Sequence, residues 1–166
     1  MEMTKLIKYD GSLIQRVNSK IGITNKLLSL RTKEKRNIIH LDDHSLFHKG
    51  VSNCITAQNP NWVVTHFLTS ENTLEYISKC LLTRETIDLI ITDLNHGVLN
   101  GYEFAKELRI LEQNYNKRIP VLLISMVANY DLAKKGLAER LFDDCLPKNL
   151  SCEKIMASIE KILKSI

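Results

Sequence analysis

Proline and glycine are scarce in this 166-residue chain, which holds three prolines and six glycines. This scarcity excludes a collagen-like or low-complexity chain, and a 44% share of hydrophobic residues excludes disorder of the whole chain. No apolar run reaches the roughly 18–20 residues of a membrane helix, and the N-terminus lacks the apolar segment of a secretory signal. We therefore expect a cytoplasmic protein with one domain of ordinary size, or one domain and an appendage.

Cysteine is also sparse, with four residues that are widely spread and show no C-x-x-C spacing. A disulfide scaffold would need more cysteines in a shorter chain. The sequence therefore predicts four free thiols. They are Cys54, Cys80, Cys145 and Cys152.

The net charge of +4 is unevenly distributed along the chain. Residues 1–36 hold nine basic and three acidic residues, whereas the remaining residues hold 14 basic and 16 acidic ones. The basic character thus belongs to the N-terminal segment and not to the body. This distribution argues against nucleic-acid binding by the body, so DNA is not an expected partner.

From residue 37 onward, short apolar segments alternate with amphipathic ones. The strands are expected at residues 37–42, 62–68, 88–93, 119–125 and 141–146, and the helices at 44–57, 71–82, from 101, at 127–140 and at 151–165. Ser70 is the expected N-cap of the second helix. Continuous apolar strands alternating with helices predict a doubly wound parallel sheet with helices on both faces, which binds its ligands at the carboxyl ends of the strands.

Polar residues stand at the ends of four of these strands. Asp42 and Asp43 end the first, Asp93 the third and Ser125 the fourth, and Lys148 follows the fifth. Because the carboxyl ends of parallel strands share one edge, we expect one pocket with three carboxylates, a hydroxyl and an ammonium group.

The chemistry of such a pocket favours phosphoryl transfer. Carboxylates at close range repel one another and require a cation, and an all-oxygen site suits Mg²⁺ or Mn²⁺. An aspartate oriented by a lysine can attack phosphorus and form an aspartyl phosphate. A nearby serine can donate a hydrogen bond to a phosphate oxygen, and positioning with charge neutralisation is most of what this reaction needs.

These residues resemble a known family. From residue 37 to 166 the chain is similar to the receiver domain of response regulators, the CheY-like module of two-component signalling, and within it to receivers of LuxR/NarL-type regulators. The resemblance implies a flavodoxin-like five-stranded sheet of order 2-1-3-4-5. The similar stretches are 38–44, 87–94 with Gly101 beyond them, 119–125 and 146–148.

The resemblance also implies a role for each polar strand-end residue. Asp93 corresponds to the phosphoacceptor, Ser125 to the switch hydroxyl and Lys148 to the family's lysine. The implied Mg²⁺ ligands are the carboxylates of Asp42, Asp43 and Asp93 and the backbone carbonyl of Asn95. The implied function is a phosphoacceptor switch and not a classical enzyme: a sensor histidine kinase phosphorylates Asp93, and the altered surface regulates a protein partner.

Some positions depart from the family pattern. His96-Gly97 replaces the usual Met-Pro, Asn100 replaces a frequent aspartate, and Cys145 replaces the aromatic switch residue. The segment between the fourth strand and the lysine is about one residue longer than usual. These departures leave open a phosphorylation-independent interaction module with the same fold.

Two other interpretations of the polar residues, a zinc site and a phosphatase site, are less favoured. His40, His44 and His48 recur every four residues, as on a zinc-binding helix, but His40 falls in the first strand, so the shared face is broken. Phosphatases of the haloacid-dehalogenase type need an Asp-x-Asp pair on the first strand, where this chain has adjacent acids.

Residues 1–36 lie outside the receiver pattern and predict an amphipathic helix over 11–30 with a solvated linker over 31–36. The helix could pack on its own receiver, mediate a homodimer or dock a partner, touch anionic lipid or nucleic acid, or stay disordered. No output domain is expected after the last helix. The protein would then signal through protein contacts around residues 127–160.

Overall fold

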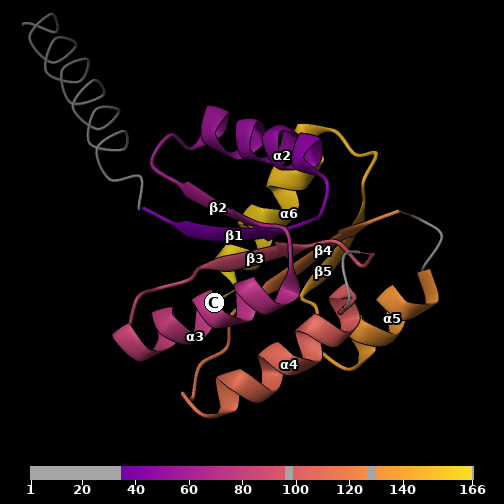
Figure 1. Ribbon diagram of the computed structural model, residues 1–166. Helices are drawn as coiled ribbons and strands as arrows, with labels where there is room; N and C mark the ends of the chain where they lie inside the picture. Colours follow the sequence, from indigo (N-terminus) through magenta and orange to yellow (C-terminus); the bar gives the residue numbers. More distant parts are fainter. Residues whose placement is uncertain (1–34, 96–98, 127–129, 166) are drawn as a thin grey trace, which may run out of the picture. The chain divides into compact units, whose positions relative to one another are not determined.

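The computed structural model describes residues 35–95, 99–126 and 130–165 (Figure 1). In these ranges the strands are β1 (Asn37–Leu41), β2 (Val63–Phe67), β3 (Leu89–Thr92), β4 (Val121–Ser125) and β5 (Asp144–Pro147). The helices are α2 (Ser45–Gln58), α3 (Ser70–Thr83), α4 (Gly101–Gln113), α5 (Tyr130–Ala138) and α6 (Cys152–Lys164). The helix expected over residues 11–30 lies outside the described residues. Among the helices of the described ranges, none combines the length and the apolar character that a bilayer crossing requires.

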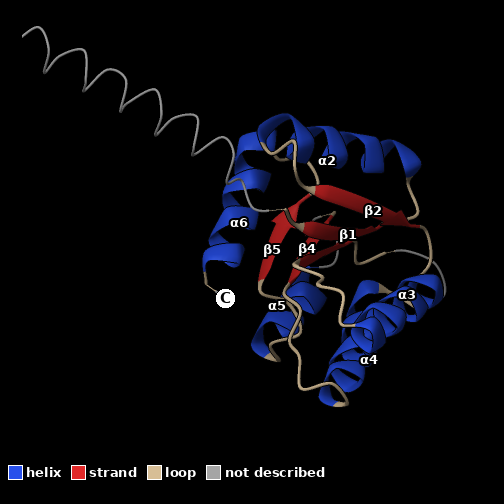
Figure 2. Ribbon diagram, turned by 90° about the vertical axis from the view of Figure 1, so that its left-hand side faces the viewer, coloured by secondary structure: helices blue, strands red, loops and turns tan. Residues whose placement is uncertain are grey.

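The five strands form one parallel sheet in the order β2-β1-β3-β4-β5, which confirms the predicted topology. Helices α2 and α6 cover one face, and α3, α4 and α5 cover the other (Figures 1 and 2). Successive side chains of a strand point to opposite faces. Accordingly, Ile38 packs under α2 and α6, whereas Ile39 and Leu41 pack under α3 to α5. Both faces of the sheet are therefore buried, so a polar ligand can reach it only where the strands begin or end.

Several predicted boundaries differ from the observed ones by one to three residues. The fourth strand begins at Val121, after Pro120, which has no N–H to donate to a ladder. The fifth begins at Asp144, because Phe142 instead packs against the end of α5, where a Cβ on Gly136 would lie 2.2 Å from its ring. Thr69, not Ser70, caps α3, since the Thr69 hydroxyl accepts a hydrogen bond from the backbone N–H of Asn72.

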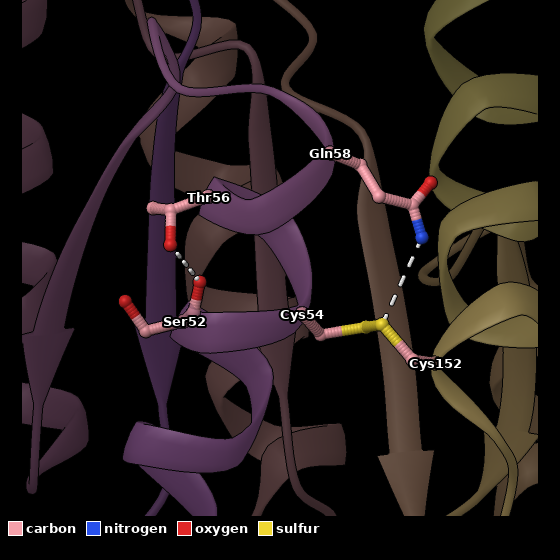
Figure 3. The surroundings of a disulfide bond; sticks show 5 residues. All are labelled: Ser52, Cys54, Thr56, Gln58 and Cys152. Atoms are coloured by element: carbon pink, nitrogen blue, oxygen red, sulfur yellow. Dashed lines mark hydrogen bonds between the residues drawn. A yellow bond between two sulfur atoms is a disulfide. The ribbon is translucent and has the colours of Figure 1, made fainter.

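The prediction of four free thiols was wrong for one pair. Cys54 of α2 and Cys152 at the start of α6 form a disulfide, with their Cα atoms 5.5 Å apart (Figure 3). The two residues are 98 positions apart, so only the packing of α2 beside α6 on one face of the sheet brings them together. Cys80 and Cys145 are free thiols, as predicted.

The amino edge of the sheet, where the strands begin, carries buried carboxylates that each pair with an arginine. The Asp88 carboxylate lies 2.8 Å from the Arg36 guanidinium and accepts a hydrogen bond from the backbone N–H of Asn37 at 2.7 Å. Glu112 accepts hydrogen bonds from Arg109 at 2.7 Å and from the backbone N–H of Ile119 at 2.6 Å. Arg36, expected in a solvated linker, is thus tied to the folded body. These pairs join the starts of β1, β3 and β4 to the elements beside them.

Candidate functional site at the carboxyl edge of the sheet

Three charged side chains meet where β1, β3 and β5 end. The ammonium nitrogen of Lys148 lies 2.8 Å from Oδ2 of Asp42 and 2.7 Å from Oδ2 of Asp93. Both aspartates are buried, with exposed fractions of 0% and 4%. The structure therefore unites three of the predicted site residues in one cluster, because parallel strands end at the same edge.

Lys148 is held in its charged form. Burial alone would lower the pKa of Lys148, but its hydrogen bonds to Asp42 and Asp93, and the charges of these carboxylates, outweigh this effect and raise the pKa above the usual lysine value. Its Nζ also lies 4.8 Å from the centroid of the Phe47 ring. One positive charge is thus shared between two buried carboxylates, which leaves the cluster with an excess of negative charge.

Backbone groups hold the two aspartates in place. Oδ1 of Asp42 accepts a hydrogen bond from the backbone N–H of His44 at 2.8 Å, and Oδ1 of Asp93 accepts one from Leu94 at 2.6 Å. The start of α4 packs directly beneath Asp93, since a Cβ on Gly101 would lie 2.2 Å from the Asp93 carbonyl oxygen. The absence of a side chain at Gly101 thus allows the first turn of α4 to lie directly against the loop that carries Asp93.

The remaining predicted site residues surround this cluster. Asp43 lies at the exposed rim, where its carboxylate is 2.7 Å from Nδ1 of His44. Ser125 is buried, and its hydroxyl has no hydrogen-bond partner among the described residues, whereas its carbonyl accepts from the backbone N–H of Lys148 at 3.0 Å. Asn95 is exposed and lines a cavity together with Asp93.

This cavity, of about 630 Å³, opens beside Asp93 and Lys148. Its apolar rim was not foreseen from the sequence: Leu46 and Met126 are 81% and 62% exposed, and Phe47 also lines the space. The signal that could have found them is their place in the chain, because each follows a strand end closely. Asp93 thus faces a space that a reactant can enter.

The donor set suits a hard divalent cation. Asp42, Asp43 and Asp93 bring carboxylate oxygens from two strand ends, and Asn95 lines the same cavity as Asp93. Mg²⁺ prefers such oxygens, and the negative excess of the cluster favours a cation. The residues present therefore fit Mg²⁺.

The departures from the family pattern have local explanations where the structure describes them. The Asn100 side chain accepts hydrogen bonds from the backbone of Tyr102 and Glu103 and forms a capping box with Glu103 at the start of α4. Cys145 is half-buried at the edge of the core, where burial, followed by the charge of Asp144, raises the pKa of its thiol. His96-Gly97 lies outside the described residues.

The three histidines share no single helix face, as predicted, but His48 is buried beside His40 instead of standing on the helix surface with His44. His44 faces Asp43, whereas His40 and His48 gather with His66 of β2. Burial, followed by the charges of His48, His66 and Lys148, holds the pKa of His40 well below its usual value. His66 lies beside His40 because the two residues are paired across β1 and β2, and the sequence spacing does not reveal this pairing.

A doubly wound parallel sheet with an Asp–Lys–Asp cluster at its carboxyl edge defines the class of the molecule. Residues 38–160 match the model of the response regulator receiver domain. The chain belongs to this family, whose members are regulatory phosphoacceptor modules of two-component signalling and not classical enzymes.

Solved structures agree with this fold. The chain is similar to the chemotaxis response regulator CheY4 of Vibrio cholerae, with 22% identity, a TM-score of 0.63 and coverage of 77% of this chain and 98% of the other. It is also similar to the receiver domain of the histidine kinase CKI1 from Arabidopsis thaliana complexed with Mg²⁺ and BeF₃⁻, with 19% identity, a TM-score of 0.66 and coverage of 79% and 91%. A search of the curated proteins found no match.

Proposed function

We propose that this chain is a phosphoacceptor switch in which a sensor histidine kinase phosphorylates Asp93 and the altered surface regulates a protein partner. The observation that carries the proposal is the Asp42–Lys148–Asp93 cluster, with Lys148 at 2.8 and 2.7 Å from the two carboxylates, beside a cavity that Asp93 lines. A buried carboxylate that faces a cavity and an ammonium group is placed for nucleophilic attack.

The reaction needs little from the protein besides positioning and charge. A carboxylate oxygen of Asp93 forms a bond to phosphorus, while the bond from phosphorus to the imidazole nitrogen of the donor phosphohistidine breaks. The leaving imidazole keeps the electron pair and takes up a proton. Lys148 remains protonated and stabilises the negative oxygens of the transferring group.

Asp42, Asp43, Asp93 and the Asn95 carbonyl are the residues that would hold Mg²⁺. When bound, Mg²⁺ supplies charge neutralisation at the phosphoryl oxygens. The CKI1 receiver domain with Mg²⁺ and BeF₃⁻ supports this assignment by analogy, since it has the same fold. The Asp43 carboxylate is the most exposed of the three and has the shortest path to solvent.

Ser125 connects the phosphorylated state to the rest of the fold. Its buried hydroxyl has no hydrogen-bond partner among the described residues, so a phosphoryl oxygen on Asp93 offers it an acceptor. Its carbonyl already accepts from the backbone of Lys148, which links the ends of β4 and β5. A shift here would alter the surface of α5, β5 and α6, where we place the downstream partner.

The test is the intact mass of the protein after incubation with acetyl phosphate and Mg²⁺. We expect the wild type to gain one phosphoryl group and Asp93→Asn to gain none. Asp131→Asn removes an exposed carboxylate from α5 and serves as the matched control, which should react as the wild type does. Omitting Mg²⁺ should abolish the gain.

Three results would overturn the proposal: no gain in the wild type, an equal gain in Asp93→Asn, or a gain that does not need Mg²⁺. The first would favour an interaction module that works without phosphorylation. The exposed side chains of Leu46 and Met126 would then be the place to begin a search for its partner.

A further inference from the structure

Three imidazole rings, those of His40, His48 and His66, gather between the sheet and α2. His40 of β1 and His66 of β2 are paired in register, and His48 of α2 lies against both. The ring centroids are 4.8 Å apart for His40 and His48, 4.6 Å for His48 and His66, and 5.5 Å for His40 and His66. One nitrogen of each ring lies within 4.8 Å of those of the other two.

The buried rings lack the hydrogen bonds that their burial demands. His40 is fully buried, and neither of its ring nitrogens has a hydrogen-bond partner among the described residues. Nε2 of the buried His48 is also without a partner there. Burying a polar atom without a hydrogen-bond partner costs free energy and is rare in native proteins. These nitrogens are therefore candidates to bind a ligand.

We propose that His40, His48 and His66 form a binding site for a divalent transition-metal ion such as Zn²⁺. Three neutral nitrogen donors suit Zn²⁺, Ni²⁺ or Cu²⁺, whereas Mg²⁺ and Ca²⁺ select oxygen. Three histidines and one open position form a common arrangement for zinc. The set is therefore chemically distinct from the carboxylate site, although His40 stands only two residues before Asp42.

The surroundings allow an ion to enter and be held. His66 is the most exposed of the three and provides the path from solvent. The Phe47 ring packs edge-on against His40, with centroids 5.8 Å apart. Zinc–nitrogen bonds are about 2.0–2.1 Å long, so a bound ion would draw the three rings closer and link α2 to β1 and β2.

The test is calorimetric titration of the full chain with Zn²⁺, without an affinity tag and with excess Mg²⁺ to occupy the carboxylate site. We expect the wild type to bind one equivalent of Zn²⁺ and to gain thermal stability from it. His66→Gln and His48→Gln should each weaken binding by at least about tenfold. His66→Gln changes the most exposed of the three, so its fold should survive even if another variant fails to fold.

His44→Gln is the matched control, because His44 belongs to the separate group of Asp42, Asp43 and His44. Its affinity for Zn²⁺ should equal that of the wild type. Visible absorption of the Co²⁺-loaded protein provides a second readout, which should show bands of a tetrahedral nitrogen-rich site that disappear in His66→Gln. The proposal fails if the wild type binds no Zn²⁺, if His66→Gln binds as well as the wild type, or if His44→Gln weakens binding as much as His66→Gln.

Discussion

The amino edge and the carboxyl edge of the sheet both carry buried carboxylates, but these carboxylates have different partners. At the amino edge, Asp88 and Glu112 each combine an arginine partner with a hydrogen bond from a backbone N–H. At the carboxyl edge, Asp42 and Asp93 share one lysine. The Ser125 hydroxyl there has no partner among the residues that the structure describes.

The difference separates structural from functional charges. A buried carboxylate that has its own arginine and a backbone donor holds elements together, and removing it leaves an uncompensated charge. An edge with surplus negative charge and unpartnered polar atoms is suited to bind what is missing, such as a cation or a phosphoryl group. The number of cationic partners for each buried carboxylate, rather than the residue types, thus marks the candidate site.

The largest effect should come from breaking the amino edge. Glu112→Gln removes the charge that pairs with Arg109 and disturbs the acceptor for the Ile119 N–H, so we expect a loss of about 3–5 kcal/mol in the free energy of unfolding. Guanidinium denaturation measures it. Glu107→Gln, on the exposed side of the same helix, should change stability by less than about 0.5 kcal/mol. Similar losses in the two variants would contradict a structural role for the Glu112 network.

The disulfide should have the next largest effect. Reducing the bond between Cys54 and Cys152 opens a loop of about 100 residues and increases the conformational entropy of the unfolded chain. We therefore expect a loss of about 2–4 kcal/mol in the free energy of unfolding. Denaturation with and without a reductant measures it. The double variant Cys54→Ser/Cys152→Ser should be insensitive to the reductant. A wild type that is equally insensitive would show that the bond adds no stability.

Gly101 tests how closely the carboxyl edge is packed. Gly101→Ala places a methyl group against the Asp93 carbonyl, so we expect a loss of about 1–3 kcal/mol and slower phosphoryl uptake from acetyl phosphate. Gly50→Ala in α2 meets no atom within 4 Å and should instead stabilise the protein by about 0.5–1 kcal/mol. Equal behaviour of the two variants would refute a positioning role for Gly101.

The smallest effect on stability should come from the phosphoacceptor itself. Asp93→Asn loses an ion pair with Lys148 but relieves repulsion from Asp42, so its unfolding free energy should stay within about 1 kcal/mol of the wild type. Asp88→Asn at the amino edge should lose about 1.5–3 kcal/mol, because two charge-assisted hydrogen bonds weaken there. Thermal denaturation compares them. A larger loss of stability in Asp93→Asn than in Asp88→Asn would contradict this difference between the two edges.

Much of this molecule follows from short patterns in the chain. Apolar runs alternating with amphipathic segments predict the parallel sheet, and a parallel sheet brings its strand ends to one edge. That logic is enough to predict that Asp42, Asp93 and Lys148 lie together, as they do. The misplaced limits of the fourth and fifth strands arise where a proline and a buried aromatic outweigh the local pattern.

The remaining features depend on which surfaces meet in three dimensions. The Cys54–Cys152 bond needs α2 and α6 on one face of the sheet, and the histidine cluster needs His66 opposite His40 with α2 above both. Periodicity reports on neighbours three or four residues apart, whereas these contacts join residues far apart in the chain. The sequence by itself determined the class of fold and the polar strand ends. Only the tertiary structure decided the disulfide, the imidazole cluster and the apolar rim of the cavity, because register and helix packing determine which distant side chains touch.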